Sequence, residues 1–128
     1  MRLGTWPTKI AKGTLAEKLY GSTEVMERHR HRYEFNMKYR DRMKEKGFMI
    51  SGTSPDGALA ELVELRDHPY FVGCQYHPEF QSKPNKPHPL FKGFIQACLV
   101  RQPNPETRAA TGPLSPPRVP DQELALQR

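Results

Sequence analysis

Prolines gather at the end of this chain and limit the length that can fold. The chain has 128 residues and 13 prolines. Almost half of those prolines follow Gln102, namely Pro103, Pro105, Pro113, Pro116, Pro117 and Pro120. Few aliphatic residues accompany them, so this segment buries too little surface to offset the entropy lost on ordering. The sequence therefore predicts one folded domain over residues 1–102 and a disordered Pro-rich tail over 103–128.

The remaining composition narrows the class of protein. No apolar run approaches the length of a membrane span, and Met1–Gly4 lacks the apolar stretch of a signal peptide. These features predict a soluble, cytoplasmic protein with no membrane partner. Cys74 and Cys98 each lie within an apolar run, which predicts reduced, buried thiols.

Local signals in the first half of the chain predict short helices and a β-hairpin. Thr14 as N-cap and Gly21 as stop bracket a short helix. Residues 24–26 suit a short strand, and residues 36–46 suit a helix that Asn36 caps. The Ser54–Gly57 turn has proline and glycine where a β-turn favours them, so residues 48–53 and 58–65 should pair as an antiparallel hairpin.

The second half contains a nearly continuous apolar run over Tyr70–Tyr76, typical of a strand buried on both faces. Pro89–Val100 follows as the clearest helix, with a broad apolar face that should pack against this strand. Together the elements predict an α/β fold: a partial central sheet, flanking helices and a hairpin.

His77-Pro78-Glu79 ends the apolar strand and is the first candidate site. Histidine acts as a general base when a third group fixes its tautomer, and a carboxylate two residues away can do so. The spacing alone also fits a structural histidine. A nucleophile is missing, because no cysteine or serine has the flanking glycines of a strained nucleophile turn.

The second candidate is the segment Arg28–Arg32, in which an extended chain would place three arginines on one side and two histidines on the other. Such a row can bind a carboxylate or phosphate, and it also fits a polar edge strand. A zinc site at His29 and His31 would need further ligands, so no metal site is predicted. Glycine-rich phosphate loops are absent, so the sequence gives no support for a nucleotide cofactor on this chain.

Basic residues are concentrated between Arg28 and Lys46 in a chain of net charge +6. A nucleic-acid-binding surface and a solvated helix face both fit this pattern, and the solvated face is the commoner case. The prediction is that nucleic acid is not a partner.

Four segments in order resemble one known family. They are Met1–Gly4, RHRHRYEFN (Arg28–Asn36), GCQYHPEFQSKP (Gly73–Pro84) and HPLFKGF (His88–Phe94). Over roughly residues 1–102 the chain resembles the C-terminal half of the class I, triad-type glutamine amidotransferase domain of CTP synthase. The resemblance implies an α/β amidotransferase fold.

The resemblance also implies an activity and the roles of three residues. In that family, glutamine is hydrolysed through a cysteine thiolate, and the ammonia released aminates UTP to CTP in an ATP- and Mg²⁺-dependent ligase reaction of pyrimidine biosynthesis. His77 matches the catalytic histidine, Glu79 the carboxylate that orients it, and Arg32 a glutamine-binding arginine.

Other parts of the family's enzyme have no match in this chain. The nucleophilic cysteine, its oxyanion glycines and the synthetase domain that uses ATP and Mg²⁺ match positions upstream of Met1. We therefore expect a fragment that is inactive alone, from an enzyme that the family implies is a homotetramer. The alternative is a non-catalytic remnant or partner subunit that docks on a full-length homologue.

Overall fold

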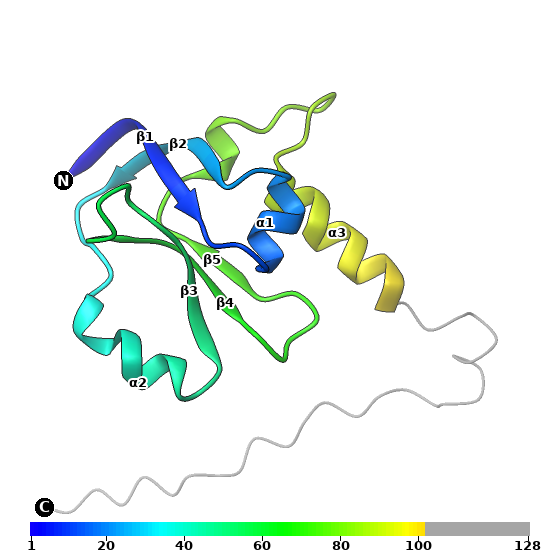
Figure 1. Cartoon of the computed structure of the whole chain (residues 1–128). Coiled ribbons are helices and arrows are strands. Elements are labelled where there is room, and N and C mark those ends of the chain that lie inside the picture. The colour runs from blue at the N-terminus through cyan, green and yellow to red at the C-terminus, as the bar shows by residue number, and fades with distance from the viewer. Residues whose placement is uncertain (102–128) are drawn as a thin grey trace, which may run out of the picture.

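A computed structural model describes residues 1–101 of the chain (Figure 1). The predicted tail over 103–128 lies outside the described residues. The elements, in chain order, are β1 (Arg2–Ile10), α1 (Leu15–Tyr20), β2 (Glu24–His31), the 3₁₀ turn η1 (Met37–Tyr39), α2 (Arg40–Lys44), β3 (Phe48–Thr53), β4 (Ala60–Leu65), β5 (Val72–Cys74), the 3₁₀ turn η2 (Pro78–Phe80) and α3 (Pro89–Arg101).

The strands form one five-stranded sheet in the order β2-β1-β3-β4-β5, and every neighbouring pair is antiparallel. Strand β1 has no counterpart among the predicted elements, because polar residues and Pro7 interrupt its pattern. Pro7 is tolerated because β1 pairs with β3 only at Lys9 and Ile10, so no ladder on that side needs the missing N–H. On its other side β1 pairs with β2 along almost its whole length.

The predicted hairpin is present as β3 and β4. The Ser54 side chain accepts from the Leu59 N–H and donates to Asp56, and Gly57 takes a positive φ of 75° that its lack of a Cβ allows. These contacts close the turn locally, which is why the sequence predicts it well.

Helix α1 also forms as predicted. The Thr14 hydroxyl accepts from the Glu17 N–H, and Gly21 ends the helix in the left-handed region with φ 66°. The helix predicted over 36–46 begins instead as η1 and continues as α2. The Asn36 side chain caps that first turn by accepting from the Lys38 N–H.

Helix α3 spans the predicted segment, and it packs chiefly on α1 (Figure 1). Gly93 permits the contact, because a Cβ there would lie 2.3 Å from Leu19 Cδ2. The helix reaches the predicted strand at Leu90, which joins the core with Val72 and Cys74, and at Phe94, whose ring lies 5.7 Å from that of Tyr70 between centroids. Much of the apolar face is nevertheless exposed, including Phe94, Ile95 and Leu99.

The prediction that Tyr70–Tyr76 is a strand buried on both faces is wrong for the described residues. The strand is limited to Val72–Cys74, its residues are half-buried, and it lies at the edge of the sheet next to β4. An edge position leaves one side without a strand neighbour, and α3 covers only part of its face. The buried core is correspondingly small: Ile10, Ala16, Leu62, Tyr76 and Leu90.

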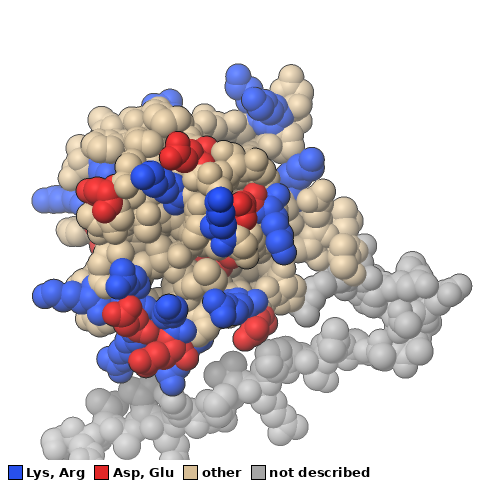
Figure 2. Space-filling model, viewed as in Figure 1, with Lys and Arg blue, Asp and Glu red and all other residues tan. Residues whose placement is uncertain are grey.

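The basic residues near α2 lie among acidic residues on the surface. Blue and red side chains lie side by side in the lower left of Figure 2, and the Arg40 guanidinium bonds to Asp41 at 3.2 Å with both side chains exposed. This mixed charge is typical of a solvated helix face. None of the helices in residues 1–101 has both the length and the apolarity needed to cross a bilayer.

Candidate functional site

His77 and Glu79 lie on one tight turn just after β5. His77 is the N-cap of η2, and Pro78 fixes the first position of that turn. Glu79 Oε1 lies 2.8 Å from His77 Nδ1. This contact assigns the proton to Nδ1, which leaves Nε2 with a free lone pair on a side chain that is 35% exposed. The hydrogen bond from His77 also lowers the pKa of the Glu79 carboxyl.

Neighbouring groups hold this turn against β2. The His77 N–H donates to the carbonyl oxygen of Arg28 at 2.8 Å. The Phe80 ring stacks on the imidazole of His77 with centroids 5.2 Å apart, and the Arg28 guanidinium lies 5.5 Å from the centroid of Phe80. The imidazole is therefore fixed by its backbone, by a carboxylate and by a stacked ring.

Arg32 lies apart from this pair. It follows the end of β2 in an exposed bend, where its guanidinium sits 5.9 Å from the centroid of the Tyr33 ring. Within residues 1–101 it forms no hydrogen bond or ion pair with His77 or Glu79. The structure thus brings together two of the three predicted site residues and leaves Arg32 exposed beyond the strand.

The alternation predicted for Arg28–Arg32 is present as far as β2 extends. Arg28 and Arg30 are exposed, whereas His29 is buried and His31 is half-buried. Among residues 1–101, no group of three or more His, Cys, Asp or Glu side chains is arranged to hold a metal ion.

The cysteines differ from each other. Cys74 is half-buried, its thiol donates to the Tyr76 carbonyl at 3.4 Å, and burial raises its pKa to about 12. It therefore stays a thiol at neutral pH, as expected of a core residue and not of a nucleophile. The prediction that Cys98 is buried is wrong, because it lies on the part of α3 that the described residues leave uncovered.

Sequence reasoning missed a buried charge cluster on β1, β2 and β4. Arg2 bonds to both carboxylate oxygens of Glu34, at 2.7 and 2.8 Å, and its other terminal nitrogen bonds to Glu61. His29 Nε2 lies 3.5 Å from Glu61 Oε2, and the side chains of His29 and Glu61 have no exposed surface. Sequence separations of 32 and 59 residues hide these contacts from any local pattern.

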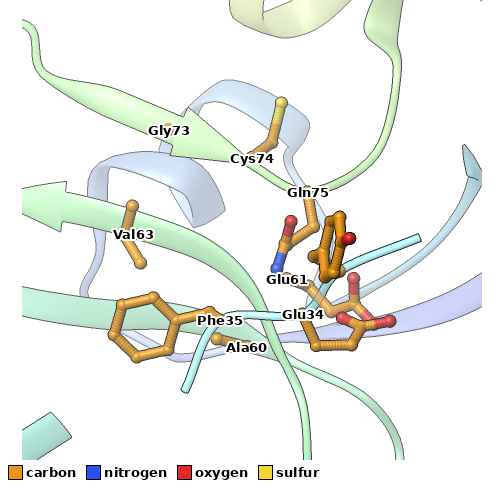
Figure 3. A pocket seen from close by; sticks show the side chains of 9 residues that line it. Glu34, Phe35, Ala60, Glu61, Val63, Gly73, Cys74 and Gln75 are labelled. Atoms are coloured by element: carbon orange, nitrogen blue, oxygen red, sulfur yellow. The ribbon is translucent and has the colours of Figure 1, made fainter. Parts of the chain in front are cut away.

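A cavity of about 390 Å³ opens beside this cluster (Figure 3). Glu34 and Glu61 lie at one end of it, and Val63 and Phe35 line the other. Burial raises the pKa of Glu61 despite the neighbouring Arg2, whereas the hydrogen bond from Arg2 lowers the pKa of the more exposed Glu34. The pKa values of the two carboxyls at this cavity are therefore shifted in opposite directions.

The chain should lose stability in acid because the buried His29 has a lowered pKa. Burial, followed by the nearby charge of Arg2, lowers its pKa from 6.5 to about 4. The unfolded chain then binds a proton more readily than the folded chain between these values. Stability from neutral His29 is present above pH 6.5 and is lost as the pH falls towards 4, by about 3 kcal/mol.

Urea unfolding of the chain and of His29→Gln between pH 4 and 8 measures this loss. The raised pKa of Glu61 acts in the opposite direction in both proteins, so the difference between the two curves isolates His29. The difference should widen in favour of the variant as the pH falls. Parallel curves would contradict the assignment.

Comparison with known proteins identifies the family. Residues 3–97 match the family described as glutamine amidotransferase class-I, and the chain belongs to that family.

Within the class, the relatives are CTP synthases. The chain is 59% identical over 109 residues to CTP synthase from a Synechococcus species. This matched segment covers 85% of the chain and 20% of that protein. It is 62% identical over 103 residues to CTP synthase from Prochlorococcus marinus, covering 80% and 18% respectively. The chain spans about a fifth of the length of these curated relatives.

A solved structure agrees with the fold. The glutaminase domain of Trypanosoma brucei CTPS with bound acivicin superposes with a TM-score of 0.74 at 35% identity, over 81% of this chain and 42% of that one. The resemblance drawn from the four sequence segments and the α/β amidotransferase fold are both confirmed.

Proposed function

We propose that this chain is the part of a glutamine-dependent CTP synthase that carries the general base of glutamine hydrolysis. The observation that carries the proposal is the 2.8 Å contact between His77 Nδ1 and Glu79 Oε1, which leaves Nε2 free to accept a proton. The similarity to CTP synthases supplies the substrate class.

In the proposed mechanism, His77 Nε2 takes the thiol proton of a cysteine that another part of the enzyme supplies. The thiolate attacks the amide carbon of glutamine, and His77 returns the proton to the leaving nitrogen, so that ammonia departs and a thioester remains. His77 then takes a proton from water, which attacks the thioester carbon; the C–S bond breaks, glutamate is released, and the leaving thiolate regains its proton from His77. Glu79 keeps the imidazole in the required tautomer and stabilises the imidazolium.

Arg32 has the chemistry to bind the substrate in this proposal. Its exposed guanidinium forms no ion pair within residues 1–101, so its donors are free for the α-carboxylate of glutamine. No residue of this chain is assigned to ATP or Mg²⁺, which the synthetase portion would bind for the amination of UTP. The full-length enzyme in this proposal is a cytoplasmic homotetramer.

A second candidate is a non-catalytic subunit that docks on a full-length homologue. The exposed apolar residues of α3, including Phe94 and Leu99, favour it because they offer an interaction surface. In this case His77 would have no catalytic role.

The purified chain should release no glutamate from glutamine above background. Without a nucleophile, the His77–Glu79 pair has nothing to activate, because the Cys74 thiol is held by burial with its pKa near 12. A coupled glutamate assay on residues 1–128 measures this. Turnover that disappears in His77→Ala would contradict the expectation and show that the chain contains its own nucleophile.

The matched test is a chimera. The 109-residue segment of the Synechococcus CTP synthase that the chain matches is replaced by the corresponding residues of this chain. We expect CTP formation with glutamine as well as with ammonia. A chimera that uses ammonia only would contradict the proposed catalytic role and favour the docking subunit.

A further inference from the structure

Glu27 is the centre of a buried hydrogen-bond network directly beneath the His77 turn. It belongs to β2, and its side chain is 3% exposed. Tyr20 Oη donates to Glu27 Oε1 at 2.8 Å, and His88 Nε2 lies 2.9 Å from the same oxygen. Gln81 Nε2 donates to the other oxygen, Oε2, at 2.8 Å. Both carboxylate oxygens therefore accept hydrogen bonds.

The direction of each bond follows from its neighbours. The Leu90 N–H donates to His88 Nδ1 at 3.3 Å, so Nδ1 is the acceptor and the Nε2–H of His88 donates to Glu27. Burial raises the pKa of Tyr20 and of Tyr76 well above the usual value, so both phenols keep their protons. Because Tyr20 donates to Glu27, Tyr76 donates to Tyr20, at 2.7 Å.

The network attaches to both ends of the His77 turn. Tyr76 immediately precedes His77 and reaches Glu27 through Tyr20. Gln81 immediately follows the turn and bonds to Glu27 directly, and its amide also donates to the Met26 carbonyl at 3.0 Å. With the bond from the His77 N–H to Arg28, four attachments tie the turn to the adjacent residues Met26, Glu27 and Arg28 of β2.

We propose that Glu27 is a positioning residue that fixes the placement of the His77–Glu79 pair. The inference rests on the proposed function, because it assigns Glu27 a role only through His77. Glu79 and Phe80 fix the imidazole within the turn, but both residues belong to the turn itself, so the place of the whole turn on β2 depends on its bonds to that strand. A fully satisfied buried network makes this attachment rigid.

The expected consequence falls on turnover and not on glutamine binding. A displacement of a reacting group by about 1 Å can cost about 10²-fold in rate. Glu27→Gln keeps the size of the side chain, but its new amide then faces the amide of Gln81, donor against donor. The bond that fixes the far end of the turn is therefore lost, while Arg32 is untouched.

The test uses the chimera with glutamine and with ammonia. In Glu27→Gln, kcat with glutamine should fall by about 10–100-fold, with little change in KM for glutamine or in the ammonia-dependent rate. The double variant Glu27→Gln/Gln81→Glu reverses donor and acceptor at the contact between residues 27 and 81 but loses the bond to the Met26 carbonyl, so it should restore only part of the lost kcat. The control is Glu64→Gln, another buried carboxylate, which accepts from the Leu15 and Ala16 N–H groups at the start of α1.

The outcomes separate the inference from the proposed function. If Glu27→Gln and Glu64→Gln reduce both activities alike, or if the double variant recovers nothing, Glu27 is structural only and the inference is overturned. If His77→Ala keeps glutamine-dependent activity, the proposed function itself fails.

A readout independent of activity uses ¹⁵N spectra of the full chain. The wild type should show the Nδ1–H tautomer of His77, and Glu27→Gln should show a mixture with the Nε2–H form. A mixture in Glu79→Gln alone, with Glu27→Gln like the wild type, would leave the His77–Glu79 pair intact and overturn the role of Glu27.

Discussion

Replacing His77 with alanine in the chimera should abolish CTP formation from glutamine. Removing the base of a nucleophile–base pair lowers kcat by about 10⁶-fold in a well-studied catalytic triad. A loss of that size would leave a rate of CTP formation too low to detect. Glu79→Gln should be milder, at most about 10⁴-fold, because His77 remains and water reaches the 56% exposed Glu79 position. Ammonia-dependent CTP formation should persist in both variants, since only the source of ammonia is damaged.

The control is His68→Ala, an exposed histidine in the turn before β5. It should match the unsubstituted chimera with either nitrogen source. Equal loss of the glutamine- and ammonia-dependent rates in His77→Ala would mean that His77 supports the fold and has no role as a base.

The largest effect on stability should come from Arg2→Met. The side chain of Arg2 is 8% exposed and bonds to Glu34 and to the fully buried Glu61. Removing one partner of a buried ion pair leaves an uncompensated charge and costs about 3–5 kcal/mol. The free energy of unfolding in urea at pH 7 measures this loss. The exposed Arg40–Asp41 pair provides the control, and Arg40→Met should change stability by less than about 1 kcal/mol.

The pH dependence of the stability lost in Arg2→Met should show that the broken ion pairs cause the loss. The pKa of Glu61 is already raised by burial, and losing Arg2 raises it further. The cost of ionised Glu61 is therefore largest at neutral pH and disappears as the pH falls through its folded-state pKa. The pKa of Glu34 is lowered, and the stability that it contributes is lost in acid by the wild type only. Both effects make the difference in free energy of unfolding between the wild type and Arg2→Met smaller in acid. A difference that stays constant from pH 7 to 4 would contradict the ion-pair explanation.

The features that the sequence predicts correctly are those set by near neighbours. Thr14 and Gly21 define α1 through bonds within one helical turn, and Ser54–Gly57 closes the hairpin by itself. His77 and Glu79 are two residues apart on a turn that Pro78 stiffens, so their contact follows from local geometry.

The features that escape prediction depend on distant parts of the chain. Strand β1 is stabilised by pairing and by burial of Arg2, and neither leaves a periodic pattern around Pro7. The apolar run of β5 has the same composition whether the strand is central or at an edge, so its sequence overstates its burial. Glu27 looks like any charged residue in a basic segment, because the groups that bury it come from residues 20, 81 and 88.

The alternation along β2 has a genetic consequence. Its inward row holds Glu27, which is bonded to groups on other elements, and His29, which is bonded to His31 of the same strand and faces Glu61 of β4. Its outward row holds Arg28 and Arg30. Deleting or inserting one codon within the strand would exchange the two rows, which would bury guanidinium groups and expose the network beneath the His77 turn. Natural variation in the length of this strand should therefore be confined to changes of two residues, while its outward positions remain open to substitution.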